Sequence, residues 1–322
     1  MRRIAMALAA VAGAACSGDL PRASLVDSVR ILATRADQPY AMPGETVTLD
    51  VLAVDGRSNP QRPMRVSWLP RACVNPPGDD YFGCYPSMRG EFTPGADLSN
   101  VLLEGPKWAF TMPADAIQGA NAHPGAAAPY GVAFAFVMAC AGHVQYSAVD
   151  TSSSSPLTTP FGCFDEANRA LGPDQFVFAF ARVYAFASLR NANPDLDHLT
   201  FAGAPVAPGG SVSVDHCPAA DESHCPKIDV DVVVPDTSWE LDPGSLAPAG
   251  LPAREAIWVD YYASGGRFDE DSAVLFDATS GRVSSTADGY AAPLSAGPGM
   301  LWAVVHDTRG GASWISVPVL VK

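Results

Sequence analysis

Outside its first sixteen residues, the chain offers no stretch on which a long helix could be built. No proline-free window of more than ten residues carries apolar residues at helical spacing. Glycine and proline instead number 28 and 29 among 322 residues, and they separate short runs in which apolar and polar residues alternate. Many short strands punctuated by turns are typical of β-sandwiches. The sequence therefore predicts an all-β fold, and its length predicts about two domains.

A short pattern occurs once in each half of the chain. Residues 42–49 read Met-Pro-Gly-Glu-Thr-Val-Thr-Leu, and residues 207–214 read Ala-Pro-Gly-Gly-Ser-Val-Ser-Val. The Pro-Gly pair favours a turn, and the alternation after it is typical of a half-buried strand. A further strand is expected before each copy, at residues 29–36 and 196–202. We therefore expect an internal repeat of two similar domains.

Later landmarks follow each copy in the same order. A strand that contains a tryptophan comes first, a long apolar strand second and a closing strand last. These strands are expected at residues 65–69, 130–139 and 176–189 in the first half, and at 257–261, 300–305 and 313–321 in the second. The polar, turn-forming stretch 190–195 marks the boundary, which gives domains at 27–190 and 191–322.

The closing strand of the first half has two unlike faces. Large aromatic side chains alternate with small ones, so the two kinds point to opposite faces of a strand. The aromatic residues are Phe176, Phe178, Phe180, Tyr184 and Phe186. This arrangement predicts a strand between a core and a cover, and an aromatic ligand platform is the alternative.

The N-terminus has the pattern of a bacterial export signal. Arg2 and Arg3 precede an apolar stretch at residues 4–15, which is too short to span a bilayer and has the length of a signal peptide. It ends in Gly-Ala-Ala before Cys16, which resembles the lipobox of bacterial lipoproteins, although glycine stands where leucine is usual. That resemblance implies a signal peptide at 1–15, a lipidated Cys16 and a tether at 16–26. Cleavage after Ala14 and plain secretion is one alternative, and an ordinary N-terminal helix is another.

The strand motifs also resemble those of a known class of domain. The Pro-Gly-x-Thr-Val-Thr-Leu strand, the tryptophan strands and the ending from Trp302 to Gly311 are similar to bacterial immunoglobulin-like and PKD-like domains. The whole chain resembles uncharacterised envelope lipoproteins with tandem Ig-like domains. The resemblance implies two Ig-like β-sandwiches, a fold that serves adhesion, spacing and ligand binding alike.

Charge and the anchor pattern together limit the partners. Thirty-four acids against twenty Lys and Arg give a net charge of −14, which argues against binding to nucleic acid or to an anionic lipid surface. We expect contact with the membrane through the lipid alone. Ser17 instead of aspartate after Cys16 favours the outer membrane, with free secretion as the alternative.

Seven cysteines support an oxidising compartment. Cys16 apart, they fall into three neighbouring pairs: Cys73 and Cys84, Cys140 and Cys163, and Cys217 and Cys225. Local pairing is the simplest of the fifteen connectivities, and each bridge would contribute about 2–4 kcal/mol. Two of the pairs would staple long insertions of the first domain, at residues 73–86 and 142–173.

Two kinds of metal site are alternatives to this interpretation. His216, Cys217, His224 and Cys225 have the ligand types of a tetrahedral zinc site, although a disulfide between the two cysteines is the simpler expectation. Acids that could ligate calcium are Asp195, Asp197, Asp229, Asp231, Asp269, Glu270 and Asp271. They lack the spacing of an EF-hand, so solvated acidic loops are the simpler expectation here too.

Catalytic patterns are missing from the sequence. It has no Gly-x-Ser-x-Gly and no His-Glu-x-x-His. His306 beside Asp307 could orient a base, but we expect Asp307 to form a turn. Aromatic residues that could stack on sugars in the second domain are Trp239, Tyr261, Tyr262 and Trp314.

The sequence therefore favours a non-catalytic envelope lipoprotein without a cofactor, which acts as a structural, adhesion, or protein- or glycan-binding module. An extracellular hydrolase or carbohydrate-active accessory protein is one alternative. A calcium- or zinc-dependent adhesin is the other.

Overall fold

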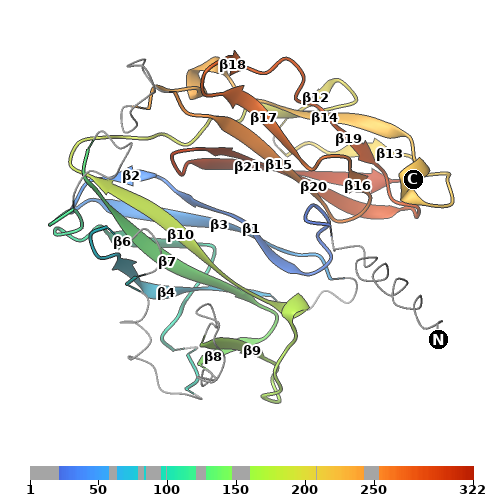
Figure 1. Ribbon diagram of the computed structural model, residues 1–322. Helices are drawn as coiled ribbons and strands as arrows, with labels where there is room; N and C mark the ends of the chain where they lie inside the picture. Colours follow the sequence, from blue (N-terminus) through green and yellow to red (C-terminus); the bar gives the residue numbers. More distant parts are fainter. Residues whose placement is uncertain are drawn as a thin grey trace, which may run out of the picture.

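The protein consists of two β-sandwiches that lie side by side (Figure 1). The computed structural model describes residues 22–57, 64–78, 83, 84, 96–98, 100–120, 128–146, 160–207, 209–242 and 254–322. Within these residues there is no α-helix, and so no helix that could cross a membrane. The all-β prediction is confirmed, whereas the expected signal peptide and Cys16 lie outside the described residues.

The first sandwich packs a three-stranded sheet against a five-stranded one. The smaller sheet has the order β1 (Val29–Ala36), β3 (Thr46–Asp55) and β6 (Lys107–Thr111). The larger sheet has the order β2 (Tyr40–Ala41), β10 (Phe176–Phe186), β7 (Tyr130–Cys140), β4 (Arg65–Val74) and β5 (Leu103–Glu104). A separate hairpin of β8 (His143–Tyr146) and β9 (Phe161–Phe164) covers the outside of the larger sheet.

The second sandwich repeats this plan. One sheet has the order β12 (Ala204–Val206), β11 (His198–Phe201), β14 (Lys227–Val233), β19 (Asp288–Ala291) and β16 (Arg267–Phe268). The other has the order β13 (Val212–Val214), β21 (Ala312–Val321), β20 (Gly297–Asp307), β15 (Ile257–Ala263), β17 (Ser272–Asp277) and β18 (Gly281–Arg282). Short 3-10 turns, η1 (Pro173–Gln175), η2 (Glu222–His224) and η3 (Asp236–Ser238), join some of these strands.

Strand pairing identifies both sandwiches as immunoglobulin-like. In each, the first strand joins one sheet antiparallel, as β1 does with β3 and β11 does with β14. The chain then crosses to the other sheet and runs parallel to the last strand, as β2 does with β10 and β13 does with β21. The two sheets of each sandwich therefore enclose one core between them.

The two copies of the Pro-Gly pattern do not occupy equivalent strands. The first copy leads into β3, which pairs antiparallel with β1 and β6. The second leads into β13, which pairs parallel with β21, whereas the counterpart of β3 is β14. Gly44 and Gly209 both have the positive φ that the turn requires, at 86° and 79°. The pattern thus specifies a turn and a strand, but it carries no information on which strand becomes the partner.

The other landmarks do occupy equivalent strands. The tryptophan strands are β4 and β15, the apolar strands are β7 and β20, and the closing strands are β10 and β21. Each central strand of the larger sheet pairs with the closing strand over ten or more residues. These long antiparallel pairs set the length of both sandwiches.

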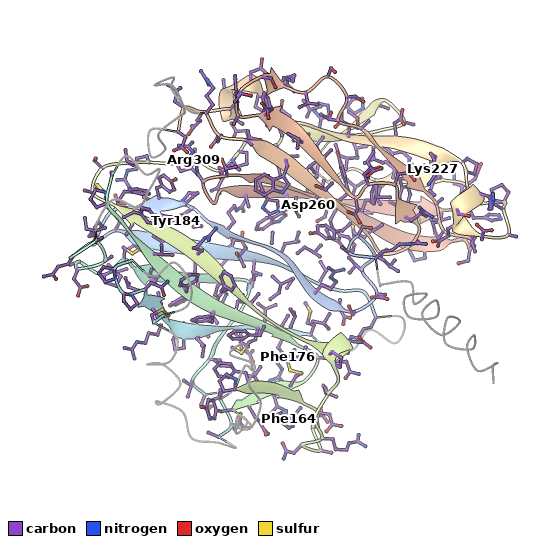
Figure 2. All side chains as sticks on the ribbon, in the orientation of Figure 1. Phe164, Phe176, Tyr184, Lys227, Asp260 and Arg309 are labelled. Atoms are coloured by element: carbon purple, nitrogen blue, oxygen red, sulfur yellow. A yellow bond between two sulfur atoms is a disulfide. The ribbon has the colours of Figure 1, made fainter. Side chains whose placement is uncertain are left out.

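Strand β10 lies between a core and a cover, as its two faces predict. Its small residues Ala181, Val183 and Ala185 face the sandwich core around Trp68. Its aromatic residues pack on the outside of the sheet against Phe134 and Phe136. Figure 2 shows Phe176 on this side of the sheet, with Phe164 of β9 beyond it. The β8–β9 hairpin therefore packs on the aromatic face of β10.

Three disulfides join the neighbouring cysteines in the structure. Cys73 is bonded to Cys84, Cys140 to Cys163, and Cys217 to Cys225. The Cys140–Cys163 bridge fixes the β8–β9 hairpin to the end of β7. The Cys217–Cys225 bridge closes a short loop around η2 in the second sandwich.

Candidate functional site: the joint between the sandwiches

An apolar contact holds the two sandwiches together along their length. The outer face of β1 and β3 packs on the outer face of β15, β20 and β21. The buried residues of this contact are Val26, Leu32, Ala33, Trp302 and Val304. At its margins the Arg35 guanidinium lies 4.3 Å from the centre of the Trp314 ring, and Arg30 lies 5.8 Å from that of Tyr262. Such cation–π pairs add to the apolar attraction.

The first residues that the structure describes are clamped onto the second sandwich. The Val26 amide donates to the Ala263 carbonyl (2.8 Å), and the Ala263 amide donates to the Ser24 carbonyl (2.9 Å). Val26 is fully buried, and Arg22 forms an ion pair with Glu222 at 2.6 Å. Residues 24–26, which the sequence placed in a tether, therefore belong to the folded body. The adjacent apolar residues Leu25 and Val26 are the signal that could have shown this.

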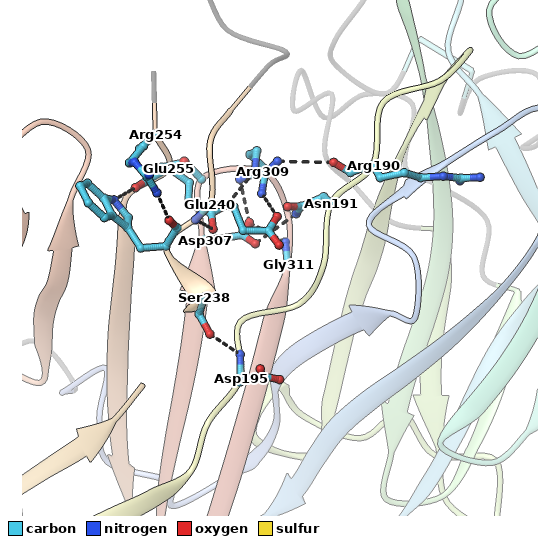
Figure 3. A network of polar contacts seen from close by, with 12 residues as sticks. Arg190, Asn191, Asp195, Ser238, Glu240, Arg254, Glu255, Asp307, Arg309 and Gly311 are labelled. Atoms are coloured by element: carbon cyan, nitrogen blue, oxygen red, sulfur yellow. Dashed lines mark hydrogen bonds and ion pairs between the residues drawn. The ribbon is translucent and has the colours of Figure 1, made fainter. Parts of the chain in front are cut away.

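At the opposite end, the linker 190–195 is bonded to both sandwiches, and Figure 3 shows its bonds to the second. The Asn193 side chain donates to the Ala36 carbonyl of the first sandwich (2.8 Å) and accepts from the Ala312 amide of the second (2.9 Å). Asn191 donates to the Asp307 carboxylate at 3.1 Å. The Asp195 amide donates to the Ser238 hydroxyl at 2.9 Å. The polar stretch 190–195, which was predicted to be a domain boundary, is thus held in place by hydrogen bonds to both sandwiches.

Arg309 is the centre of this joint. Its side chain is 2% exposed, and its Nε donates to Glu255 Oε2 at 2.6 Å. A second nitrogen pairs with Glu240, and Nη1 donates to the Arg190 carbonyl of the linker at 3.4 Å. The guanidinium also lies 5.9 Å from the centre of the Tyr40 ring of the first sandwich. Arg309 therefore contacts both sandwiches and the linker.

Burial changes the acidity of this network. It raises the pKa of the Glu255 carboxyl to about 7, although the Arg309 guanidinium acts in the opposite direction. It also raises the pKa of Asp307. A charge removed from water favours its neutral form unless a partner compensates it. Arg309 is thus the partner that allows Glu255 to carry a charge inside the protein.

Asp307 shapes the turn that places Arg309, as the sequence predicts. Its Oδ1 accepts hydrogen bonds from the amides of Arg309 and Gly311, each at 2.7 Å. A side chain at Gly311 would place its Cβ 2.2 Å from Asp307 Oδ2 and 3.1 Å from the Ala192 carbonyl. Glycine is therefore required where the turn meets the linker.

His306 does not form a base with Asp307. Adjacent residues on β20 point to opposite faces, and Asp307 is buried whereas His306 is half-buried on the outer face. His306 instead stacks on Trp258, with ring centres 5.2 Å apart, and approaches Asp260 at 3.3 Å. This is a cross-strand pair between β15 and β20, a structural contact rather than a catalytic pair.

The zinc alternative does not fit the structure. Cys217 and Cys225 are bonded to each other, so neither has a thiolate to offer. His216 Nδ1 lies 2.7 Å from the Lys322 carbonyl oxygen, and His224 pairs with Asp221 at 2.9 Å. The histidines thus flank the bridge and have partners of their own.

The acids considered as calcium ligands have other partners or stay apart. Asp231 accepts a hydrogen bond from Thr286 at 2.8 Å, and Asp269 pairs with Lys227 at 2.6 Å. Across the part of the chain that the structure describes, no three His, Cys, Asp or Glu side chains lie close enough to hold a metal ion. The acidic stretches are therefore loops and strand edges.

The aromatic residues considered for sugar stacking serve packing instead. Tyr261 is 1% exposed in the second core. Tyr262 and Trp314 lie in the contact between the sandwiches. The Trp239 indole donates to the Glu255 carbonyl (2.8 Å) and lies under Arg254. The outward face of β15, which carries Tyr262, is covered by the other sandwich.

A shallow cleft of about 270 Å³ opens at the end of the first sandwich. It lies between the end of β4 and residues 115–120, and its lining includes Asn75, Pro77, Gln118 and Tyr130. Asp115 is the one charged residue of its described lining, so the cleft brings together no acid–base pair.

The residues that form the joint were not predicted from the sequence. Glu240, Glu255 and Arg309 lie in three separate loops, and nothing in their spacing relates them. One weak signal existed: Glu255 and Arg309 each lie two residues from a strongly apolar strand, at the same end of the sheet.

Comparisons with known proteins add little. No protein family matches the chain, and no curated protein is similar to it. Among solved structures, fibronectin(III)-like modules of Clostridium thermocellum CbhA are 12% identical with a TM-score of 0.23, covering 91% of this chain and 94% of theirs. The D0-D1 domain of intimin is 12% identical (TM-score 0.21, covering 90% and 99%), and the Yersinia pseudotuberculosis adhesin InvE is 9% identical (0.20, covering 91% and 60%). At these scores the fold assignment rests on the strand order of this chain alone.

Proposed function

We propose that this protein is a non-catalytic, lipid-anchored module of the bacterial cell envelope, whose two Ig-like sandwiches act as one rigid body that presents a fixed surface to a protein or glycan partner. The observation that carries this proposal is the double connection between the sandwiches. The Arg309 network closes one end, and the clamp of residues 24–26 closes the other.

This arrangement suits presentation more than spacing. Two sandwiches joined by a free linker would extend and swivel, since interfaces between domains of one chain are commonly small. Here the linker, the N-terminal segment and an apolar contact all oppose such motion. A rigid body holds a binding surface in one orientation and loses less entropy when it binds.

The envelope location is supported by the signal pattern and by the three disulfides, which persist in oxidising compartments. The non-catalytic role is supported by the packing of the candidate residues. His306, the zinc candidates and the four aromatic residues are each engaged in structural contacts.

The anchor is tested by replacing Cys16 with serine. The wild-type protein should partition with membranes and into detergent, whereas the C16S variant should be released or retained as an unprocessed precursor without acyl mass. Ser17→Ala is the matched control, and it should stay in the membrane fraction. A C16S variant that is processed and partitions with membranes as the wild type does would contradict the anchor.

A further inference from the structure

The bonds of residues 22–26 to the second sandwich decide which end of the molecule an anchor at Cys16 would hold. Residue 22 is the first described residue, and its side chain binds Glu222 inside the Cys217–Cys225 loop. That loop is bonded to the rest of the same end: the Cys217 amide donates to the Pro293 carbonyl, and the His216 amide donates to the Lys322 carbonyl. We call this end, with Arg22, residues 215–226, residues 293–297 and Lys322, the anchor end.

Arg22 lies six positions after Cys16 in the sequence. Even fully extended, six residues reach about 20 Å. The joint lies at the opposite end of β20, an 11-residue strand, which spans about 35 Å. Figure 2 shows this separation, with Lys227 at the anchor end and Arg309 at the joint. A lipid at Cys16 therefore cannot bring the joint to the membrane surface unless the molecule lies flat.

The surface of the anchor end fits a bilayer that is reached through a lipid rather than through charge. Leu294 and Leu320 are 42% and 51% exposed there. Arg22 at this end is paired with Glu222, and Lys227 beside it is paired with Asp269. Paired cations attract anionic headgroups less than free ones, whereas exposed leucines can contact the interfacial region.

From these observations we propose that the anchor end faces the membrane and that the joint end of both sandwiches, including the cleft beside Tyr130, faces away from it toward a partner. This orientation rests on the proposed anchor at Cys16. It follows from the short reach of the chain before Arg22, and a longer tether would remove it. It places the end of the first sandwich that carries Asn75, Gln118 and Tyr130 far from the membrane.

Two matched reporters test the orientation. Ser295→Cys lies at the anchor end and Ser188→Cys follows β10 at the joint end, and both positions are exposed. Each variant carries a fluorescent donor and is bound to liposomes that contain acceptor-labelled headgroups. Energy transfer should be severalfold higher from position 295 than from position 188. It should not change when phosphatidylglycerol is added, because charge does not set the orientation. Equal or reversed transfer would overturn the proposal.

Two further arms separate this proposal from the anchor itself. If the natural protein does not associate with liposomes, the anchor at Cys16 is refuted. The orientation is then tested with a hexahistidine tag in place of residues 1–16 on nickel-chelating lipids, which keeps the attachment point close to Arg22. Insertion of twenty Gly/Ser residues before Arg22 should abolish the difference between the two reporters, since such a linker has an r.m.s. length of about 25 Å and no preferred direction. A difference that survives this insertion would show that the surface, not the tether, orients the molecule.

Discussion

Replacing Arg309 with methionine removes the cation at the centre of the joint while keeping much of its apolar volume. Glu255, which is 1% exposed, then loses its partner. Removal of one member of a buried ion pair costs about 3–5 kcal/mol, because the other charge stays buried without compensation. The linker carbonyl of Arg190 also loses its donor. We therefore expect R309M to lower the free energy of unfolding by about 3–5 kcal/mol at pH 8.

A double variant separates the pair from the packing. Glu255→Gln removes the charge that R309M leaves behind, so the combined variant should regain about 1–3 kcal/mol of the loss. The assay is urea unfolding with the disulfides intact, followed both by tryptophan fluorescence and by circular dichroism to check that the two transitions coincide. Arg169→Met is the surface control, since this side chain is 80% exposed in its pair with Asp165, and it should cost less than about 1 kcal/mol. A loss below about 1 kcal/mol for R309M, or no recovery in the double variant, would refute the central role of this pair.

Three further predictions concern the clamp of residues 24–26, the pKa of Glu255 in the joint, and the Cys217–Cys225 disulfide. Val26→Asp should release the N-terminal segment and cost at least the burial energy of a valine, about 1.5–3 kcal/mol, with earlier proteolysis after Arg22; unchanged proteolysis and stability would show that the clamp is unimportant. The Glu255 carboxyl has an ordinary pKa of 4.5 in the unfolded chain and a pKa of about 7 in the folded protein, so between these pH values only the folded protein holds the proton. The free energy of unfolding should therefore fall as the pH rises from about 4.5 to about 7. This fall should be smaller in E255Q, and an identical fall would exclude Glu255 as its source. Replacing Cys217 and Cys225 with serine removes a disulfide between residues 8 apart in the sequence, which should lower the free energy of unfolding by about 2.5 kcal/mol in the chain-entropy model. EDTA should leave the Tm of the oxidised protein unchanged. A Tm that falls with EDTA would instead support a metal site.

The strands themselves were predictable because their signals are local. Alternation in β3 and β21, and the opposite faces of β10, follow from a period of two residues along the chain. The partner of a strand is not local information. For this reason the two Pro-Gly motifs were predicted to be equivalent, although they lead into β3 and β13, which have different partners.

The contact between the sandwiches escaped prediction for a related reason. A single sequence shows that Tyr262 and Trp314 point away from their own core, but it does not show whether water or another sandwich lies there. Likewise Arg309 meets Glu255 across 54 residues and Arg190 across 119. Such long-range polar pairs follow no periodic pattern in the sequence, so they become visible only in the folded structure.

If the two sandwiches move as one body, two labels on different sandwiches must stay at one distance from each other. Spin labels at Lys107→Cys on β6 and Val274→Cys on β17 report on different sandwiches from exposed positions. Double electron–electron resonance should give a single narrow distance, and the R309M variant should broaden it. A broad distribution in the unaltered protein would contradict a rigid joint and, with it, the proposal that these sandwiches present a fixed surface.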